Sequence, residues 1–147
     1  MGNDNSDGCF NRSSIMSKAP DAFVYNATLD RIIDGDTFDC VIDLGFNVRL
    51  HKQRVRLAGI DTPESRINIK RYPHRAKEKV MGKAAKERLK ELCCGKFKVK
   101  SLGKGKYGRI LGVPFDENGN DICKMLIDEG HAIEYWGGTK TKQWGDT

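Results

Sequence analysis

Along the first half of the chain, apolar and polar residues alternate with the two-residue period of β-strands that bury one face. Residues 23–33 and 37–44 are rich in aromatic and β-branched types, which predicts two strands or one long bent strand pair. Alternation continues over residues 43–60, with breaks expected at Gly45 and at 51–53. The positions expected to face a core here are Val48, Leu50, Val55, Leu57 and Ile60. This half of the chain therefore predicts a β-meander.

The second half changes to a helical period over residues 75–94, with Gly95 as the stop. Its expected apolar face consists of Val80, Ala84, Ala85, Leu89 and Leu92. Two further strands are predicted at 96–102 and 107–115, followed by the polar turn Asp116-Glu117-Asn118-Gly119-Asn120. A second helix is predicted over residues 121–132, capped by Asp121 and interrupted at Gly130.

The element order β, β, β, α, β, β, α with short connections predicts a small closed antiparallel barrel that carries helices. We expect one domain over residues 23–137, with a disordered tail at 1–22 and a short tail at 138–147. The 38% content of hydrophobic residues is enough to fill one core of this size.

Charge and cysteine content narrow the possible partners. Lys and Arg exceed Asp and Glu by 26 to 20, so the formal net charge of +6 favours an anionic partner. The five cysteines are odd in number and lack C-x-x-C spacing, so we expect reduced, mostly buried thiols in place of disulfides or a zinc site. The three scattered histidines are not expected to bind metal.

The N-terminus carries Met-Gly-x-x-x-Ser with Cys9 nearby, a pattern for myristoylation at Gly2 plus palmitoylation. We rank a disordered tail above a membrane anchor, and Met16 is an alternative start. No apolar stretch approaches the length of a membrane span and no secretory signal is visible, so a cytoplasmic location is expected.

Two acidic turns follow predicted strands, at Asp34-Gly35-Asp36 and at residues 61–64. Turn chemistry explains each one singly, because Asp bonds its own backbone and an acid suits the start of a helix. Brought together, Asp36 and Asp61 would offer the hard oxygen ligands that Ca²⁺ requires. Arg56 on the neighbouring strand and Arg109, after Gly108, would add forked donors for a phosphate.

The motifs IDGDT, RLAGIDTPE and KYGR occur in this order, with a lysine-rich helix between the last two. Together they resemble the staphylococcal (micrococcal, thermonuclease) nuclease family over about residues 23–136. The resemblance implies an α+β, mainly β fold: a five-stranded OB-fold barrel with two or three packed helices. The third, C-terminal helix usual in the family's type member is expected to be missing, because the sequence stops at Thr147.

The resemblance also implies a chemistry and a set of roles. Water attacks phosphorus in DNA and/or RNA, the 5′ oxygen leaves, and a 3′-phosphate remains, with endonucleolytic action and Ca²⁺ as cofactor. The implied Ca²⁺ ligands are Asp36, Asp61 and the backbone carbonyl of Thr62, with Asp34 supporting the site through water. The implied catalytic residues are Glu64, which positions or deprotonates water, and the phosphate clamp Arg56 and Arg109.

Nucleotide-binding residues are less sharply indicated. Tyr107 and Lys106 match positions near the nucleotide phosphate, and Gly105 replaces a frequent acid of the family. Tyr135 and Trp136 are equally explained as base-stacking residues or as aromatics at the edge of the core. The basic loop 65–75 follows the catalytic turn and predicts salt-sensitive contacts to a nucleic-acid backbone.

Two other classes of function remain open: a non-catalytic OB-fold module that binds nucleic acid or protein, and an anchored interaction protein. A module that has lost catalysis should lack at least one of the five residues implied to bind metal or act in catalysis. All five are present here: Asp36, Arg56, Asp61, Glu64 and Arg109. An enzyme is therefore favoured, with a monomer expected.

Overall fold

The computed structural model describes residues 23–137 and Trp144, apart from the side chain of Lys106. The expected tails at 1–22 and 138–147 lie outside these residues, with Trp144 excepted. The same holds for the possible lipidation sites Gly2 and Cys9, the alternative start at Met16, and the question of a third helix.

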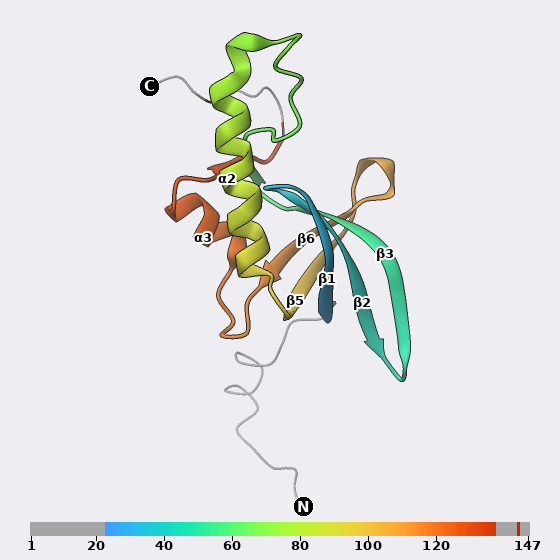
Figure 1. The fold of residues 1–147 in the computed structure, drawn as a ribbon. Helices are drawn as coiled ribbons and strands as arrows, with labels where there is room; N and C mark the ends of the chain where they lie inside the picture. The colour runs from blue at the N-terminus through green and yellow to red at the C-terminus, as the bar shows by residue number, and fades with distance from the viewer. Residues whose placement is uncertain (1–22, 138–143, 145–147) are drawn as a thin grey trace, which may run out of the picture.

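Within residues 23–137, five strands close into a barrel in the order β1-β2-β3-β6-β5 (Figure 1). Their bounds are β1 Val24–Asp34, β2 Thr37–Gly45, β3 Val48–Leu57, β5 Lys96–Lys104 and β6 Ile110–Phe115. The predicted α+β barrel is confirmed, but not its wholly antiparallel pairing, because β3 and β6 run parallel. A closed ring of five strands cannot alternate direction all the way round, so one neighbouring pair has to be parallel. A separate two-stranded sheet pairs β4 Ile60–Asp61 with β7 Ile133–Glu134.

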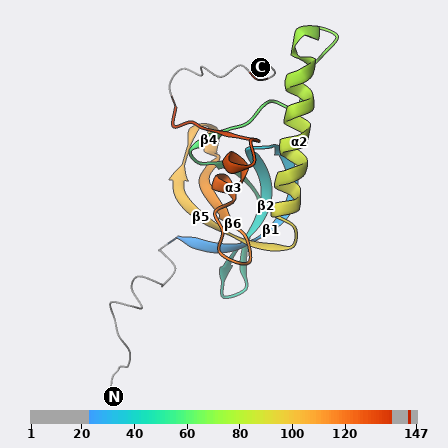
Figure 2. The same cartoon turned by 90° about the vertical axis from the view of Figure 1, so that its left-hand side faces the viewer.

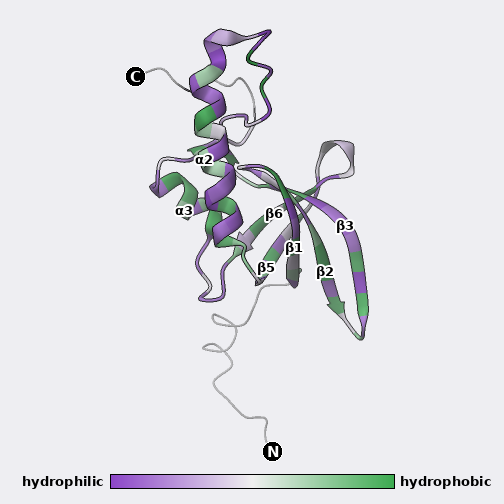
Figure 3. Ribbon diagram, viewed as in Figure 1, coloured by the Kyte–Doolittle hydropathy of each residue, from purple (hydrophilic) through white to green (hydrophobic). Residues whose placement is uncertain are grey.

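The hairpin of β2 and β3 differs from the sequence expectation in two ways. β3 is unbroken across residues 51–53, where Lys52, at φ 55°, falls in an irregularity of the β2–β3 register. Val48 and Leu50 are 48% and 40% exposed, because this end of the hairpin extends past the rest of the barrel (Figures 1 and 3). The expected core positions Val55, Leu57 and Ile60 are buried as predicted.

The long helix α2, Ala76–Leu92, lies along one side of the barrel (Figures 1 and 2). Gly82, Ala85 and Leu89 form its buried face, and Gly95, at φ 75°, follows its end as predicted. Val80, expected on this face, is 68% exposed, because the first turns of the helix project beyond the barrel (Figure 1). Ala84 is also exposed.

The short helix α3, Ile122–Asp128, lies in front of the barrel strands in Figure 2. Asp121 caps it as predicted, since its side chain accepts a hydrogen bond from the Lys124 amide at 3.1 Å. The helix is shorter than expected, ending before Gly130 at φ 82°. Its buried side chains join the barrel core, which includes Phe38, Leu57, Leu89, Phe97, Ile122 and Leu126.

The segment before β6 also differs from its prediction as strand. Residues Lys106–Gly108 form a 3₁₀ turn, and Tyr107 has a φ of 62°. A hydrogen bond from the Gly105 amide to the Arg109 carbonyl, at 2.7 Å, closes this turn. The strand therefore begins only at Ile110.

Three of the four cysteines in the described part are buried, namely Cys40, Cys93 and Cys123, and Cys94 is exposed. Burial raises the pKa of each of these three thiols to about 12. No helix in residues 23–137 combines the length and the apolar character needed to cross a bilayer.

Candidate active site

The two acidic turns predicted from the sequence meet at one end of the barrel. Asp34 ends β1, Asp36 lies in the turn to β2, and Asp61 ends the short strand β4. The pairing of Thr37 with Arg56 on β3 sets this arginine beside the first turn. A pocket of about 290 Å³ forms there, lined by Ile33, Asp34, Asp36, Thr37, Arg54, Arg56, Asp61, Thr62, Glu64, Arg66 and Arg109.

Arg56 is fixed between the barrel wall and the two acids. Its Nη1 donates to the Leu57 carbonyl at 2.7 Å and its Nη2 to the Ile60 carbonyl at 2.9 Å. The same Nη2 lies 3.5 Å from Asp36 Oδ2 and 3.8 Å from Asp61 Oδ1. Because the backbone bonds hold the guanidinium plane, its position does not depend on a flexible side chain alone.

Asp36 ties the two turns to each other. Its Oδ1 accepts a hydrogen bond from Thr37 Oγ1 at 3.0 Å, and its Oδ2 accepts one from the Thr62 amide at 3.3 Å. The Asp36 carbonyl accepts a further bond from the Leu57 amide at 2.8 Å. These contacts place a buried carboxylate across from Asp61 and make the turn a rigid part of the pocket.

Asp34 holds the chain after the second turn. Its Oδ1 accepts hydrogen bonds from the Ser65 amide, at 3.1 Å, and from Ser65 Oγ. Arg66 lies 3.5 Å from Asp34 Oδ2. These contacts tie β1 directly to the loop, and the support of a metal site through water that the resemblance implies for Asp34 stays a prediction.

Glu64 lies at the exposed rim of the pocket, and an arginine from the start of α2 holds it. Arg75 Nη2 is 3.0 Å from Glu64 Oε2 and also 3.0 Å from Glu78 Oε2. Arg75 Nε donates to Glu78 Oε1 at 2.9 Å, and the Glu64 amide lies 3.4 Å from Glu78 Oε2. Arg75 thus joins the Glu64 carboxylate to the helix, and these two bonds to Glu78 raise the pKa of its guanidinium.

Arg109 reaches the same pocket from just before the start of β6, the strand that pairs in parallel with β3. The parallel register pairs Val55 with Ile110, so Arg109 comes next to Arg54 at the junction of β3 and β6. Tyr107 is 92% exposed, and its ring centroid lies 5.9 Å from the Arg109 guanidinium carbon. Arg109 therefore faces the acids on one side and an exposed aromatic ring on the other.

Tyr135 and Trp136 line an adjacent pocket of about 470 Å³ that also contacts Arg56 and Arg109. The Trp136 ring packs directly against Gly59, where an added Cβ atom would lie 2.5 Å from the nearest ring atom. Trp136 is 72% exposed, and its Nε1 donates to Glu134 Oε2 at 3.3 Å. Both aromatics thus lie next to the two arginines, and the exposed one is not a core residue.

The acidic turns present oxygen donors, the type that hard cations prefer. Asp36 and Asp61 both approach one nitrogen of Arg56, so in this structure a guanidinium group lies at the point that their carboxylates share. The buried Thr62 Oγ1 has no hydrogen-bond partner within the part of the chain that the structure describes. No group of three or more Asp, Glu, His or Cys side chains that could hold a metal ion is found in that part. Binding of Ca²⁺ at Asp36, Asp61 and the Thr62 carbonyl therefore stays a prediction, and oxygen donors are the ligands that this ion accepts.

Comparison with known proteins identifies the family. Residues 54–144 match the staphylococcal nuclease homologue family. The chain belongs to this family. The match begins in β3 and includes Arg56, Asp61, Glu64 and Arg109, while the turn with Asp36 precedes it.

Three relatives of the chain are similar in sequence. Endonuclease YhcR of Bacillus subtilis (strain 168) is 31% identical over 116 residues, which cover 76% of this chain and 9% of that protein. An uncharacterized protein of Bacillus anthracis is 38% identical over 106 residues, 69% of this chain and 44% of that protein. An uncharacterized endonuclease of Escherichia coli is 30% identical over 106 residues, 71% of this chain and 58% of that protein. The chain therefore spans less than two thirds of the length of these relatives.

The motifs that carried the resemblance thus come together at one pocket of the structure. The seven residues expected to bind metal, support it or act in catalysis all line the 290 Å³ pocket: Asp34, Asp36, Arg56, Asp61, Thr62, Glu64 and Arg109. Tyr107, Tyr135 and Trp136 lie in adjoining pockets, and the Lys106 side chain is outside the described part.

Three features of the site were missed by sequence reasoning. Arg54 has a signal that could have found it, because it precedes Arg56 by two residues and shares its strand face. Ser65 and Arg75 belong to the loop 65–75, which was expected beside the site as a contact for nucleic acid and stays a prediction in that role, but nothing in the sequence indicated their bonds to Asp34 and Glu64.

Proposed function

We propose that this protein hydrolyses phosphodiester bonds within DNA and/or RNA at the 290 Å³ pocket, with Ca²⁺ as cofactor and 3′-phosphate products. The observation that carries the proposal is the convergence of Arg56, Arg109 and Glu64 on the pocket that holds Asp36 and Asp61. Membership of the family and two relatives that are named endonucleases support it.

Asp36, Asp61 and the Thr62 carbonyl would hold the calcium ion, which supplies positive charge for a phosphate oxygen. Arg56 and Arg109 bind the other non-bridging oxygens through their forked donors, which stabilises charge that grows as phosphorus becomes five-coordinate. Its bonds to the Leu57 and Ile60 carbonyls already hold the Arg56 guanidinium in the pocket.

Glu64 orients the attacking water and accepts its proton as the new oxygen–phosphorus bond forms. The bond between phosphorus and the 5′ oxygen breaks, and that oxygen leaves with a proton from solvent. Arg75 holds one Glu64 oxygen at 3.0 Å, which leaves the other oxygen to the water. The exposed position of Glu64 lets water reach it from outside the pocket.

The adjoining aromatics supply places for bases beside the scissile phosphate. Trp136, exposed against Gly59, and Tyr107, exposed beyond Arg109, lie on different sides of the arginine pair. Stacking is worth about 1–3 kcal/mol per base and accepts any base. We therefore expect weak preference among bases and between DNA and RNA.

The test is digestion of end-labelled single-stranded DNA and RNA by purified protein, with Ca²⁺ and with a calcium chelator. The expected result is Ca²⁺-dependent cleavage within the strand. The fragments should carry 3′-phosphates, which a phosphatase removes. Glu64→Gln keeps the size of the side chain and removes the proton acceptor, so its rate should fall at least 100-fold, within the range that general-base catalysis provides. Strand binding without cleavage by the folded wild type would reject the enzyme and favour the non-catalytic module.

A further inference from the structure

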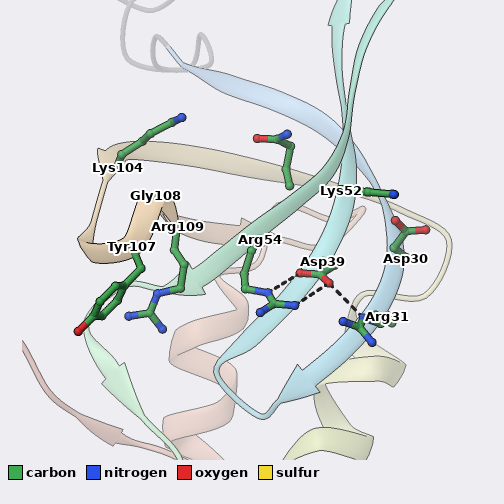
Figure 4. Close-up of a pocket in the computed structure, with 10 residues that line it drawn as sticks. Asp30, Arg31, Asp39, Lys52, Arg54, Lys104, Tyr107, Gly108 and Arg109 are labelled. Atoms are coloured by element: carbon green, nitrogen blue, oxygen red, sulfur yellow. Dashed lines mark hydrogen bonds and ion pairs between the residues drawn. The ribbon is translucent and has the colours of Figure 1, made fainter.

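A pocket of about 1010 Å³ adjoins the candidate active site and shares Arg54 and Arg109 with it. It lies on the outer face of the barrel, between β1, β2, β3 and the turn before β6 (Figure 4). Arg31, Lys52, Arg54, Lys104 and Arg109 give it five cationic side chains against the two acids Asp30 and Asp39. None of the motifs singled out in the sequence accounts for the part around Asp39.

The strand register arranges these charges as a row across the barrel. Arg31 on β1 pairs with Asp39 on β2, and Asp39 pairs with Arg54 on β3. The parallel closure adds Arg109 next to Arg54. Figure 4 shows the guanidinium groups of Arg109, Arg54 and Arg31 side by side. At about 4.8 Å per strand, three steps make a row about 14 Å long, which is longer than a single phosphate group needs.

Asp39 fixes the two arginines of the row that lie away from the acidic turns. Arg54 binds it with two donors, Nε to Oδ1 at 2.8 Å and Nη2 to Oδ2 at 3.1 Å. Arg31 Nε donates to the same Oδ2 at 3.1 Å. The two-point contact uses two of the five N–H donors of Arg54, so the rest of its fork can bind a phosphate in the pocket.

We propose that the part of this row beyond Arg109, namely Arg31, Asp39 and Arg54, binds together with Lys52 and Lys104 the backbone of a single-stranded polynucleotide next to the scissile phosphate. Asp39 is the positioning residue, and the substrate class is an extended strand of at least about four nucleotides, not a dinucleotide. The exposed ring of Tyr107 at the edge of the same pocket stacks on an unpaired base, which favours a single strand over a duplex. The inference rests on the proposed function and names the substrate of that site.

The first test measures binding and not cleavage, so it is independent of the enzymatic proposal. Fluorescence anisotropy in chelator would compare labelled single strands of about 12 and about 2 nucleotides, lengths that do and do not fill the row. If Arg31, Lys52, Arg54 and Lys104 each contact one phosphate, these four contacts alone lower affinity for the longer strand about 50-fold from 50 to 200 mM salt. The double variant Arg31→Gln, Lys52→Gln removes two of them, so its loss over the same range should be about sevenfold smaller than that of the wild type.

The matched control is Lys83→Gln, Lys90→Gln, which removes two exposed charges from α2 and none from the pocket. We expect the ratio of long-strand to short-strand affinity to fall about tenfold in the row variant and to stay constant in the control. Equal losses in the two variants, equal affinity for both lengths, or stronger binding of a duplex would overturn the proposal.

Asp39→Asn separates positioning from net charge. Removing a negative charge from a basic pocket should strengthen binding if only charge matters. Loss of the carboxylate that orients two guanidiniums should instead weaken it, and we expect about a fivefold loss for the longer strand in protein whose circular dichroism is unchanged. Tighter binding would show that Asp39 does not position the row. If Asp39→Asn fails to fold, the double variant of the exposed Arg31 and Lys52 still tests the proposal.

Discussion

At Gly82, α2 packs directly against the backbone of the loop that carries Glu64. A Cβ atom at Gly82 would lie 2.3 Å from the Glu64 carbonyl oxygen and 2.6 Å from the Ser65 nitrogen. Ordinary contact begins at 3.4 Å, so Gly82→Ala requires the helix and the loop to separate by about 1 Å. Both atoms belong to the backbone, so no side-chain rotation relieves the clash.

Two opposing effects set the size of the change. Replacing glycine by alanine inside a helix stabilises by about 1 kcal/mol through helix propensity. Overpacking of a tight contact costs about 1–3 kcal/mol, which cancels or exceeds that gain. The effect on activity should be larger, because displacing a reactive group by about 1 Å can cost 100-fold in rate.

Urea unfolding and strand cleavage measured on the same preparations would test this. Gly82→Ala should be no more stable than the wild type and should cleave about 100-fold more slowly. Lys83→Ala, at the next and exposed position of the helix, is the control and should change stability by less than about 0.5 kcal/mol. A Gly82→Ala protein that is about 1 kcal/mol more stable and fully active would refute the reasoning.

Three further predictions concern other parts of the molecule. Arg75→Gln removes the ion pair that ties Glu64 to α2, so kcat should fall about tenfold while KM stays within twofold. Steady-state kinetics measures the two constants separately, and a rise in KM with unchanged kcat would contradict this prediction. The hydrogen bond from Arg54 holds the pKa of Asp39 below its usual range, so the stabilisation from this carboxylate is present above about pH 4 and is lost as the pH falls further. Urea unfolding should therefore show the difference between wild type and Asp39→Asn shrinking from pH 6 to pH 3, and a constant difference would refute the linkage. Peptide mapping after brief thiol labelling of the native protein should find the exposed Cys94 modified. The buried thiols, whose pKa is about 12, should react only on unfolding: Cys40, Cys93 and Cys123. Early labelling of any of these three would contradict their burial.

Much of the fold could be read from the sequence because one periodic pattern dominates each element. The alternation of β1, β2 and β5 and the buried stripe of α2 follow from one face packing on a single core. The pattern failed at Val48, Leu50 and Val80, which lie where the hairpin and the helix run past the barrel. Periodicity shows which face is apolar, but not how far the rest of the protein extends to cover it.

The candidate site, like the fold, could be predicted only in part from the sequence. Local motifs were enough to indicate Asp36, Arg56 and Asp61, because a strand end and a tight turn place their own side chains. The contact of Arg75 with Glu64 crosses eleven positions of irregular loop, and the row through Asp39 depends on register across three strands. Neither could be predicted without knowing how the barrel closes.

The central claim is that Arg56 and Arg109 bind the scissile phosphate through their forks. Single-turnover cleavage of a labelled single strand by Arg56→Lys and Arg109→Lys tests it most directly, because lysine keeps the charge and loses the fork. The matched control is Arg49→Lys, at an exposed position of β3 outside this pocket. The account predicts that each active-site variant, folded as the wild type, loses about 100-fold or more in rate, while Arg49→Lys stays within about twofold. Full activity in either active-site variant would contradict the account, because charge without the fork would then be enough.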